Sequence, residues 1–551
     1  MDLITQHRVT QEAENFIASI DPSAVCDLAS SFHPAKKQCR IFSDVKKGGF
    51  NVCFPVEFTE DAADDNTPER WMIRIPILPR LAFPKEKLRG EIATMKFIAE
   101  KTTIPIPRLH GYSINSENQL GLPFMLLEFI EGKPLFTVEV RKLPRPQKRE
   151  LFAKLGDIYI QLFQHKFDRI GALTLDAKDE NWVFDHNRPL SVLMNDQTLA
   201  GIEPRFIGPN QTFQSAMDYV YAIHQALLDD FFQGKDSIMN EEDAHSYLYS
   251  LHKSRQFLME WVKPEHNHGP FILNHGDLRS ANILVDDDLN ILSVLDWEWS
   301  HTIPVQMFVP PSWLDGLELV GTAKMPSRLL YESSLFTLRM ETRRREKKYH
   351  LECPSLDDLP LAKIWGETLE SPAVFIALGL LQPLYFGNIY WSVLEYDYYG
   401  NERIHYRKRM EDFYSLETHK AELEAVQRKV QELELFQQEC DKLGIQREQQ
   451  NIEQTNSPSK EALMSPNVNF HARASLYCLR TSLESLALQI SFQGQTMSRL
   501  RWALIGSTLI AACYLFVTRK ESDYASKRPA YFGVGVLWAF KIASGVRWRI
   551  Q

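Results

Sequence analysis

Residues 274–282 place an acidic side chain and an amide five positions apart, and a second acidic side chain follows fourteen positions later. The acidic residues are Asp277 and Asp296, and the amide is Asn282. Mg²⁺ accepts carboxylate and amide oxygens as ligands, and a further carboxylate can orient and deprotonate an attacking hydroxyl. The pattern therefore favours phosphoryl transfer from a Mg-nucleotide, with Asp277 as base and Asn282 and Asp296 as metal ligands.

Two short apolar segments, 283–285 and 291–295, lie on either side of the acidic turn 286–290. This alternation predicts a β-hairpin, which would return Asp296 to the side of Asn282. An isolated Asp and Asn would more simply be a helix cap and a solvated turn. The His-Gly-Asp that precedes Asn282 and the Asp-Trp-Glu that follows the second strand favour the kinase-like interpretation.

The first part of the chain supplies candidate phosphate-binding residues. A turn between two predicted strands of segment 41–58 contains Gly48 and Gly49, which would let the backbone approach phosphates. Taken alone, the pair is more simply an ordinary hairpin turn. Strand 71–76 carries Arg74, which is usually a solvated edge charge in such a position. An ion pair with Glu91, in the helix that follows, would instead direct this cation at nucleotide phosphates.

The strand 123–129 is apolar and runs into a turn. This is where a two-lobed kinase would place its hinge, so we expect the backbone of Glu128 and Ile130 to bind adenine. Apolar residues recur at helical spacing over 148–163 and 216–232. A strand-rich first part and a helix-rich second part indicate an α+β fold with two lobes.

Composition and charge narrow the function classes. The chain has 551 residues, of which 44% are hydrophobic and 24% charged, and its net charge is -9. Such an acidic body lacks the basic face that nucleic-acid binding requires. Seven cysteines without a Cys-x-x-Cys pair, and an N-terminus without a secretory or transit signal, indicate a reducing compartment. We therefore expect a cytoplasmic or cytosol-facing protein that is not secreted.

Taken together, these segments resemble the aminoglycoside phosphotransferase and choline kinase-like family, in particular its fungal members. The matching segments cover roughly residues 35–445 and are 48–51, 71–76, Glu91, 104–107, 124–132, 167–173, 274–282, 296–299 and 310–314. The resemblance implies a protein-kinase-like fold with a β-rich N-lobe and a mainly helical C-lobe. It implies ATP and Mg²⁺ as cofactors, Asp277 as catalytic base, and Asn282 and Asp296 as metal ligands. Glu298 would be an additional ligand.

Three departures from related kinases bear on activity. Gly276 stands where protein kinases carry Arg, and Asp-Trp-Glu at 296–298 stands where they carry Asp-Phe-Gly. Both favour a small-molecule hydroxyl acceptor over a protein substrate. Arg74 stands where many active relatives use Lys, and its planar fork binds phosphate with a different geometry. The alternatives are therefore a catalytically inactive nucleotide-binding or scaffold protein and, third, a protein kinase.

The acceptor is the least defined part of the prediction. Acidic residues beyond residue 314, including Asp315, Glu318 and Glu332, are candidates for binding an amine or amino sugar. A solvated surface position is the simpler interpretation of each. The apolar stripe in 410–445 predicts either a short coiled coil or a terminal helix packed on the C-lobe.

The C-terminal part differs in composition from the rest. We expect an N-terminal helical extension at 1–34, an N-lobe at 35–132, a C-lobe at 133–448, a polar linker at 449–497 and a hydrophobic basic tail at 498–551. Within the tail, 502–517 is free of charge and would span roughly 24 Å as a helix, somewhat less than the ~30 Å of a hydrocarbon core. Together with 530–546 it is a candidate membrane anchor. The alternatives are a packed soluble helix and a tail that gene prediction added in error.

Overall fold

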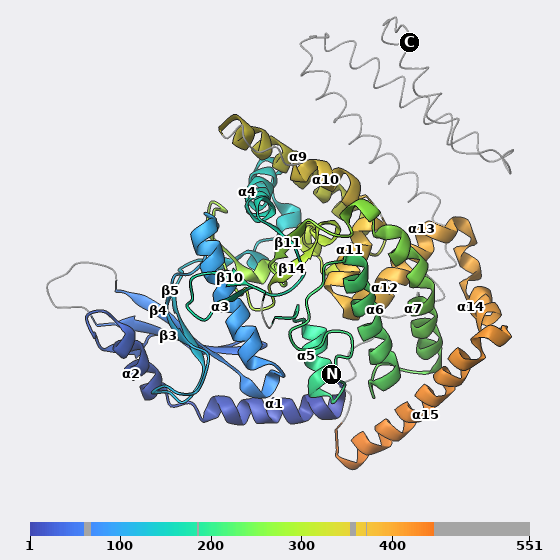
Figure 1. Ribbon diagram of the computed structural model, residues 1–551, viewed down its shortest axis with the longest axis horizontal. Coiled ribbons are helices and arrows are strands. Elements are labelled where there is room, and N and C mark those ends of the chain that lie inside the picture. The colour runs from blue at the N-terminus through green and yellow to red at the C-terminus, as the bar shows by residue number, and fades with distance from the viewer. Residues whose placement is uncertain (60–67, 185–186, 353–359, 371, 446–551) are drawn as a thin grey trace, which may run out of the picture. The chain divides into compact units, whose positions relative to one another are not determined.

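The first two helices are α1 (Leu3–Ala18) and α2 (Pro22–Phe32). Both begin after an aspartate, Asp2 or Asp21, whose side chain accepts a hydrogen bond from a backbone N–H of the first turn. Such caps satisfy donors that a helix start leaves unpaired. The computed structural model, shown in Figure 1, describes residues 1–59, 68–184, 187–352, 360–370 and 372–445.

An antiparallel sheet of six strands follows (Figure 1). The strands are β1 (Cys39–Ile41), β2 (Lys46–Lys47), β3 (Asn51–Phe58), β4 (Arg70–Pro76), β5 (Leu109–Ser113) and β6 (Phe124–Glu128). Their order is β1-β3-β4-β6-β5, and β2 also pairs with β3. Gly48 and Gly49 lie in the turn between β2 and β3. Trp71 and Ile73 pack in a core with α1 and α2. Because side chains alternate along a strand, Arg74 faces the opposite side.

Helix α3 (Pro84–Lys101) covers the face of the sheet toward which Arg74 points. Its buried residues Ile92 and Met95 belong to the same core as Met125 of β6, which pairs with Arg74 in register. The rigid φ of the proline at its start suits the first turn of a helix. This packing places Lys87 and Glu91, one turn apart, beside the sheet.

The part of the chain that follows β6 is mostly helical (Figure 1). Its longer helices are α4 (Arg145–Gln164), α5 (Val192–Leu199), α6 (Ala216–Gln233), α7 (Glu241–Trp261), α9 (Ser327–Glu352), α10 (Leu361–Thr368), α11 (Ala373–Leu381), α14 (Tyr406–Ser415) and α15 (Lys420–Lys442). Shorter ones are α8 (Leu319–Thr322), α12 (Phe386–Ile389) and α13 (Glu395–Tyr399). The helices predicted at 148–163 and 216–232 are α4 and α6. The α+β fold class, with its sheet-rich first part and mainly helical second part, is confirmed.

Short strands in the helical part carry the segments predicted to be catalytic. Strand β11 (Phe271–Asn274) pairs with β14 (His301–Pro304) and β8 (Lys166–Phe167). Strand β12 (Ile283–Val285) pairs with β13 (Ile291–Val294) and β7 (Lys133–Pro134). A two-stranded ladder joins β9 (Thr174–Leu175) to β10 (Trp182–Val183). The hairpin predicted between 283 and 295 is therefore confirmed.

Helix α15 buries one side along its length and contacts α7. The residues that it buries include Val426, Leu433 and Cys440. Of the two alternatives for 410–445, the structure shows the helix packed on the body of the protein.

The predicted linker and tail, including 502–517 and 530–546, lie outside the described residues. Within the described ones, no single helix has both the length and the hydropathy to cross a membrane. Helices α10 and α11 are long and apolar enough to cross a membrane only when taken together, and the chain bends by 99° between them.

Candidate active site

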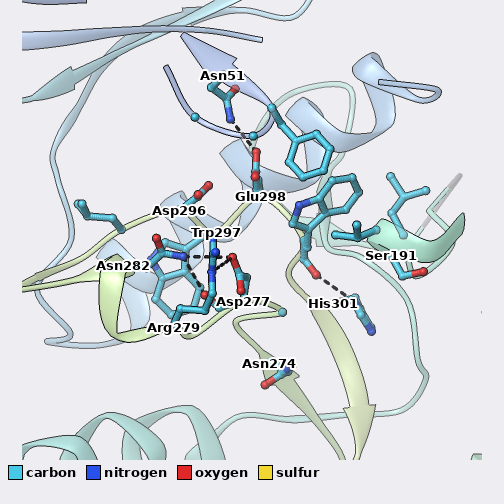
Figure 2. Close-up of a pocket in the computed structure, with 18 of the residues that line it drawn as sticks. Asn51, Ser191, Asn274, Asp277, Arg279, Asn282, Asp296, Trp297, Glu298 and His301 are labelled. Carbon is cyan, nitrogen blue, oxygen red and sulfur yellow. Dashed lines mark hydrogen bonds and ion pairs between the residues drawn. The ribbon is translucent and has the colours of Figure 1, made fainter. Parts of the chain in front are cut away.

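The predicted base and one predicted metal ligand lie in the loop between β11 and β12 (Figure 2). The side-chain amide of Asn282 donates from Nδ2 to the backbone carbonyl of Asp277 at 2.8 Å. Because this bond fixes which end of the amide faces the loop, the carbonyl oxygen Oδ1 is the atom available to a ligand. The guanidinium of Arg279 donates from Nε to Oδ2 of Asp277 at 2.9 Å. The loop therefore holds both side chains by local bonds.

Gly276 is required by the conformation of this loop. Its φ is +81°, a value that residues with a side chain rarely adopt. A Cβ added there would lie 2.3 Å from the backbone carbonyl oxygen of Trp299. His275, just before it, is buried and packs against Trp297 with ring centroids 4.4 Å apart and the ring planes tilted by 44°. The loop is thus pressed against the segment that follows β13.

The hairpin of β12 and β13 brings Asp296 beside Asn282. The backbone N–H of Leu295 donates to the carbonyl oxygen of Asn282 at 2.8 Å, which joins the two loops directly. Asp296 has a φ of +68°, an uncommon value for a residue other than glycine. Such backbone strain tends to occur where the surrounding structure fixes a functional side chain.

Arg74 connects the sheet, α3 and the Asp296 loop. One nitrogen of its guanidinium lies 2.5 Å from Oε1 of Glu91, so the predicted ion pair is confirmed. The other nitrogen bonds Asp296 and lies 3.1 Å from Oε2 of Glu298. Its side chain is 9% exposed, and that of Glu91 is fully buried. The single buried guanidinium of Arg74 therefore forms ion pairs with three carboxylates.

Two further residues of this cluster were missed by the sequence prediction. Lys87, whose side chain is 2% exposed, forms an ion pair with Glu298 and lies 3.9 Å from Glu91. Asn51 donates from Nδ2 to Oε2 of Glu298 at 2.7 Å (Figure 2). Lys87 stands four positions before Glu91, a spacing that places both on one side of a helix, so the sequence held a signal for it. Asn51 gave no comparable signal.

The carboxylates of Asp277 and Asp296 have pKa values shifted in opposite directions. Burial raises the pKa of Asp277 above its ordinary value. Arg279 lowers this pKa, whereas the negative charges of Asp296 and Glu298 raise it further. For Asp296 burial acts in the same direction, but the nearby charges of Arg74 and Lys87 outweigh it and lower the pKa. Asp277 is therefore the more basic of the two carboxylates, as a proton acceptor needs to be.

Burial lowers the pKa of His275 to about 4, so its ring is neutral near neutral pH. Its Nε2 lies 2.8 Å from the carbonyl oxygen of Leu295, and its Nδ1 accepts from the backbone N–H of Asp277 at 3.3 Å. These partners assign the ring proton to Nε2. His275 thus links the two loops that carry the predicted catalytic and metal-binding residues.

A cavity of about 880 Å³ contains most of the predicted site residues. The predicted residues that line it are Gly48, Gly49, Arg74, Glu128, Ile130, Asp277, Asn282, Asp296 and Glu298. Glu91 does not line it and acts on it only through Arg74. None of the three acidic acceptor candidates lines it either. Asp315 is buried and pairs with Arg141 at 3.0 Å, and Glu332 pairs with Arg328 at 3.1 Å.

Comparison with known proteins gives one family and several distant relatives. The phosphotransferase enzyme family matches residues 62–306, which include β4, α3 and the Asp296 loop. Altered inheritance of mitochondria protein 9, mitochondrial, of Zygosaccharomyces rouxii is 31% identical over 118 residues, or 20% of this chain and 19% of that protein. A subtelomeric hrmA-associated cluster protein of Aspergillus fumigatus is 22% identical over 314 residues, or 48% and 58%. The chain thus spans less than two thirds of the length of either relative.

Among solved structures, macrolide 2'-phosphotransferase type I has a TM-score of 0.33 at 15% identity, covering 68% of this chain and 97% of that chain. The GDP complex of wild-type aminoglycoside 2'-phosphotransferase-IIIa has a TM-score of 0.31 at 14% identity, covering 66% and 98%. The family match itself extends over the strand, helix and loops that bring Arg74, Asp277 and Asp296 together. Residues 62–306 of the chain therefore match the phosphotransferase enzyme family.

Proposed function

We propose that this protein transfers the γ-phosphoryl group of ATP to a hydroxyl group of a small molecule. The observation that carries the proposal is that Asp277, Asn282 and Asp296 line one cavity. Their oxygens fit Mg²⁺, because Asp296 offers a carboxylate and Asn282 turns its carbonyl oxygen away from the bond that its amide donates. When bound there, Mg²⁺ would neutralise charge on the nucleotide phosphates.

Asp277 is the group that receives the acceptor hydroxyl. Its Oδ2 is held by Arg279, which leaves Oδ1 to accept a hydrogen bond from the hydroxyl. As the new O–P bond forms and the bond to the leaving diphosphate breaks, the hydroxyl proton passes to this carboxylate. The raised pKa of Asp277 favours that transfer, and the fixed loop supplies the orientation that such a reaction chiefly needs.

The nucleotide would lie between the sheet and the Asp296 loop. Gly49 would offer its backbone N–H to phosphates, whereas the N–H of Gly48 already donates to the carbonyl oxygen of Asn51 at 2.8 Å. The N–H of Glu128 already donates to the carbonyl of Arg108 at 2.9 Å, so its carbonyl is the group left for the base, together with the backbone of Ile130. Arg74 would keep its bond to Glu91 and exchange Asp296 for phosphate oxygens. Lys87 would keep Glu298 neutralised during that exchange.

The acceptor side of the cavity is mainly apolar. Its walls come from 189–207, α6 and 380–385. Among the described lining residues of these segments, Asp229 is the sole carboxylate, and it accepts from Gln233 at 2.7 Å and lies 3.8 Å from Arg205. Large apolar side chains line this side and remain exposed, namely Val192, Phe206, Leu384 and Tyr385. An acceptor with an apolar body and few positive charges suits these walls better than a polycationic amino sugar.

The direct test is transfer of labelled phosphate from ATP to a panel of alcohols, with GTP as a second donor. We expect Mg²⁺-dependent product with neutral apolar alcohols. Asp277→Asn should lower kcat at least ~100-fold, a typical loss for a general base, while nucleotide binding persists. Leu384→Asp should lower kcat/KM for apolar alcohols without changing nucleotide affinity. Equal transfer by Asp277→Asn and wild type would contradict the assignment of the base.

A second candidate function is nucleotide binding without transfer. It is favoured by the ion pair between Arg74 and Asp296, which occupies a predicted metal ligand. In that case Mg-ATP would bind and no acceptor in the panel would be phosphorylated. Binding measured by calorimetry beside the transfer assay separates the two functions.

A further inference from the structure

A cluster of two histidines and a glutamate lies outside the cavity, where α15 meets α7. His252 belongs to α7, His419 immediately precedes α15, and Glu422 lies in the first turn of α15. Nε2 of His252 lies 3.6 Å from Oε1 of Glu422, and Nδ1 of His419 lies 3.7 Å from Oε2 of Glu422. One ligand atom from each of the three residues lies within 4.8 Å of the others. None of the three lines the cavity described above.

These separations match a shared ion better than direct hydrogen bonds. A hydrogen bond between nitrogen and oxygen spans about 2.7–3.2 Å. A tetrahedral zinc ion with bonds of about 2.0–2.1 Å separates its ligand atoms by roughly 3.3–3.5 Å. Each histidine nitrogen lies 3.6 or 3.7 Å from a different carboxylate oxygen of Glu422, just above that range and beyond the hydrogen-bond range.

Two ligand atoms of the cluster are buried without a hydrogen-bond partner. They are Nδ1 of His419 and Oε2 of Glu422. A buried polar atom without a partner is unfavourable, so folded proteins almost always supply one. Here the two atoms lie 3.7 Å apart. A cation between them would satisfy them together.

The surroundings hold the two rings in place. Phe413 stacks on His419 with ring centroids 3.8 Å apart and meets His252 edge to face at 5.6 Å. The side chains of His252, His419 and Glu422 are 13%, 26% and 20% exposed. The site is thus shielded but reachable from solvent, which a metal ion needs in order to enter.

We propose that His252, His419 and Glu422 bind a divalent transition-metal ion, for which Zn²⁺ is the best fit. Two imidazoles and one carboxylate suit zinc, whereas Mg²⁺ and Ca²⁺ prefer oxygen ligands alone. The ion fastens the start of α15 to α7 and leaves one coordination position to water. The site stands apart from the phosphotransfer site, and its existence does not depend on the proposed function.

The test is calorimetric titration of chelator-treated, full-length protein with Zn²⁺. Glu422→Gln keeps the shape of the side chain and removes its charge, so it should fold and should lose one tight Zn²⁺ equivalent or bind that equivalent at least tenfold more weakly. His419→Ala should do the same. His245→Ala is the matched control, because His245 lies on α7 with His252 but outside the cluster. This variant should titrate like wild type.

A second readout distinguishes tetrahedral coordination from loose binding. Co²⁺ added to the chelator-treated protein should give visible absorption bands that Glu422→Gln abolishes. Zn²⁺ should also raise the Tm of wild type and leave that of Glu422→Gln unchanged. Equal Zn²⁺ stoichiometry and affinity in wild type and Glu422→Gln would overturn the proposal, and the cluster would then be a pair of long histidine–glutamate contacts.

Discussion

Lys87→Met should destabilise this protein by several kcal/mol, although Lys87 does not line the cavity. The residue belongs to a buried cluster of three carboxylates, those of Glu91, Asp296 and Glu298, and two cations, Arg74 and Lys87. Methionine keeps most of the length and apolar character of the side chain. The substitution therefore removes a charge and little packing.

The size of the effect follows from burial and charge. The side chains of Lys87 and Glu298 are 2% and 5% exposed, so solvent screens their attraction little. Removing one partner of a buried ion pair typically costs about 3–5 kcal/mol, because the other charge stays buried without it. Arg74 and Asn51 still contact Glu298, which favours the lower end of that range. Even about 3 kcal/mol is a large share of the roughly 5–15 kcal/mol that stabilises a folded domain.

The assay is equilibrium unfolding in urea, followed by fluorescence at constant pH. The matched control is Lys96→Met on the same helix. Lys96 is 32% exposed, and its partner Asp179, at 3.4 Å, is 56% exposed, so the control should cost no more than about 1 kcal/mol. Adding Glu298→Gln to Lys87→Met should restore part of the lost stability, because it removes the carboxylate that lacks its partner.

A cost of Lys87→Met no greater than that of Lys96→Met would contradict this prediction, and so would a double variant in which Glu298→Gln adds its own full cost. Either result would mean that the two side chains do not depend on each other in the folded state. An unchanged m-value would show that the variants differ in stability and not in compactness.

Two more predictions concern backbone and pH. Gly276→Ala should cost about 1–3 kcal/mol more in urea unfolding than Gly316→Ala. Both glycines have similar positive φ values, but only at Gly276 would a Cβ press on the carbonyl of Trp299. Equal costs would show that the loop can move aside. Burial lowers the pKa of His301 to about 4. The unfolded chain therefore takes up a proton near pH 6.5 that the folded one refuses until about pH 4, and stability falls on acidification through that window. His301→Gln should lessen this fall by up to about 1.4 kcal/mol per pH unit, whereas an unchanged slope would place the titration elsewhere.

The catalytic loop and its hairpin could be predicted from sequence because their geometry is local. Asn282 and Asp296 are separated by two short strands and a turn, so one β-hairpin determines where Asp296 lies relative to Asn282. The pairing of Arg74 with Glu91 was also predictable, since a strand and the next helix of one lobe usually pack together. In both cases few alternative paths exist for the intervening chain.

The apolar wall at which we propose that the acceptor binds could not be predicted in this way. Asp315 was a candidate because it is acidic and follows the catalytic segments. The structure buries it against Arg141, a residue 174 positions earlier. The wall instead uses 189–207, α6 and 380–385, three segments that lie far apart in the sequence and carry mostly apolar side chains. Apolar residues have no spacing that distinguishes a binding wall from a core.

Arg74 departs from the family pattern, and its role in this protein could be assigned only from the folded structure. From sequence, an arginine in place of lysine only alters how phosphate is bound. In the folded protein, its two terminal nitrogens reach Glu91 on one side and both Asp296 and Glu298 on the other. A lysine has one compact ammonium group and lacks the two separate terminal nitrogens with which Arg74 reaches carboxylates on opposite sides. The arginine thus keeps the predicted metal ligand neutralised when no nucleotide is bound. Under the proposed function, Mg-nucleotide binding would be an exchange of partners at a single guanidinium, and its free energy would include the loss of the Arg74–Asp296 ion pair.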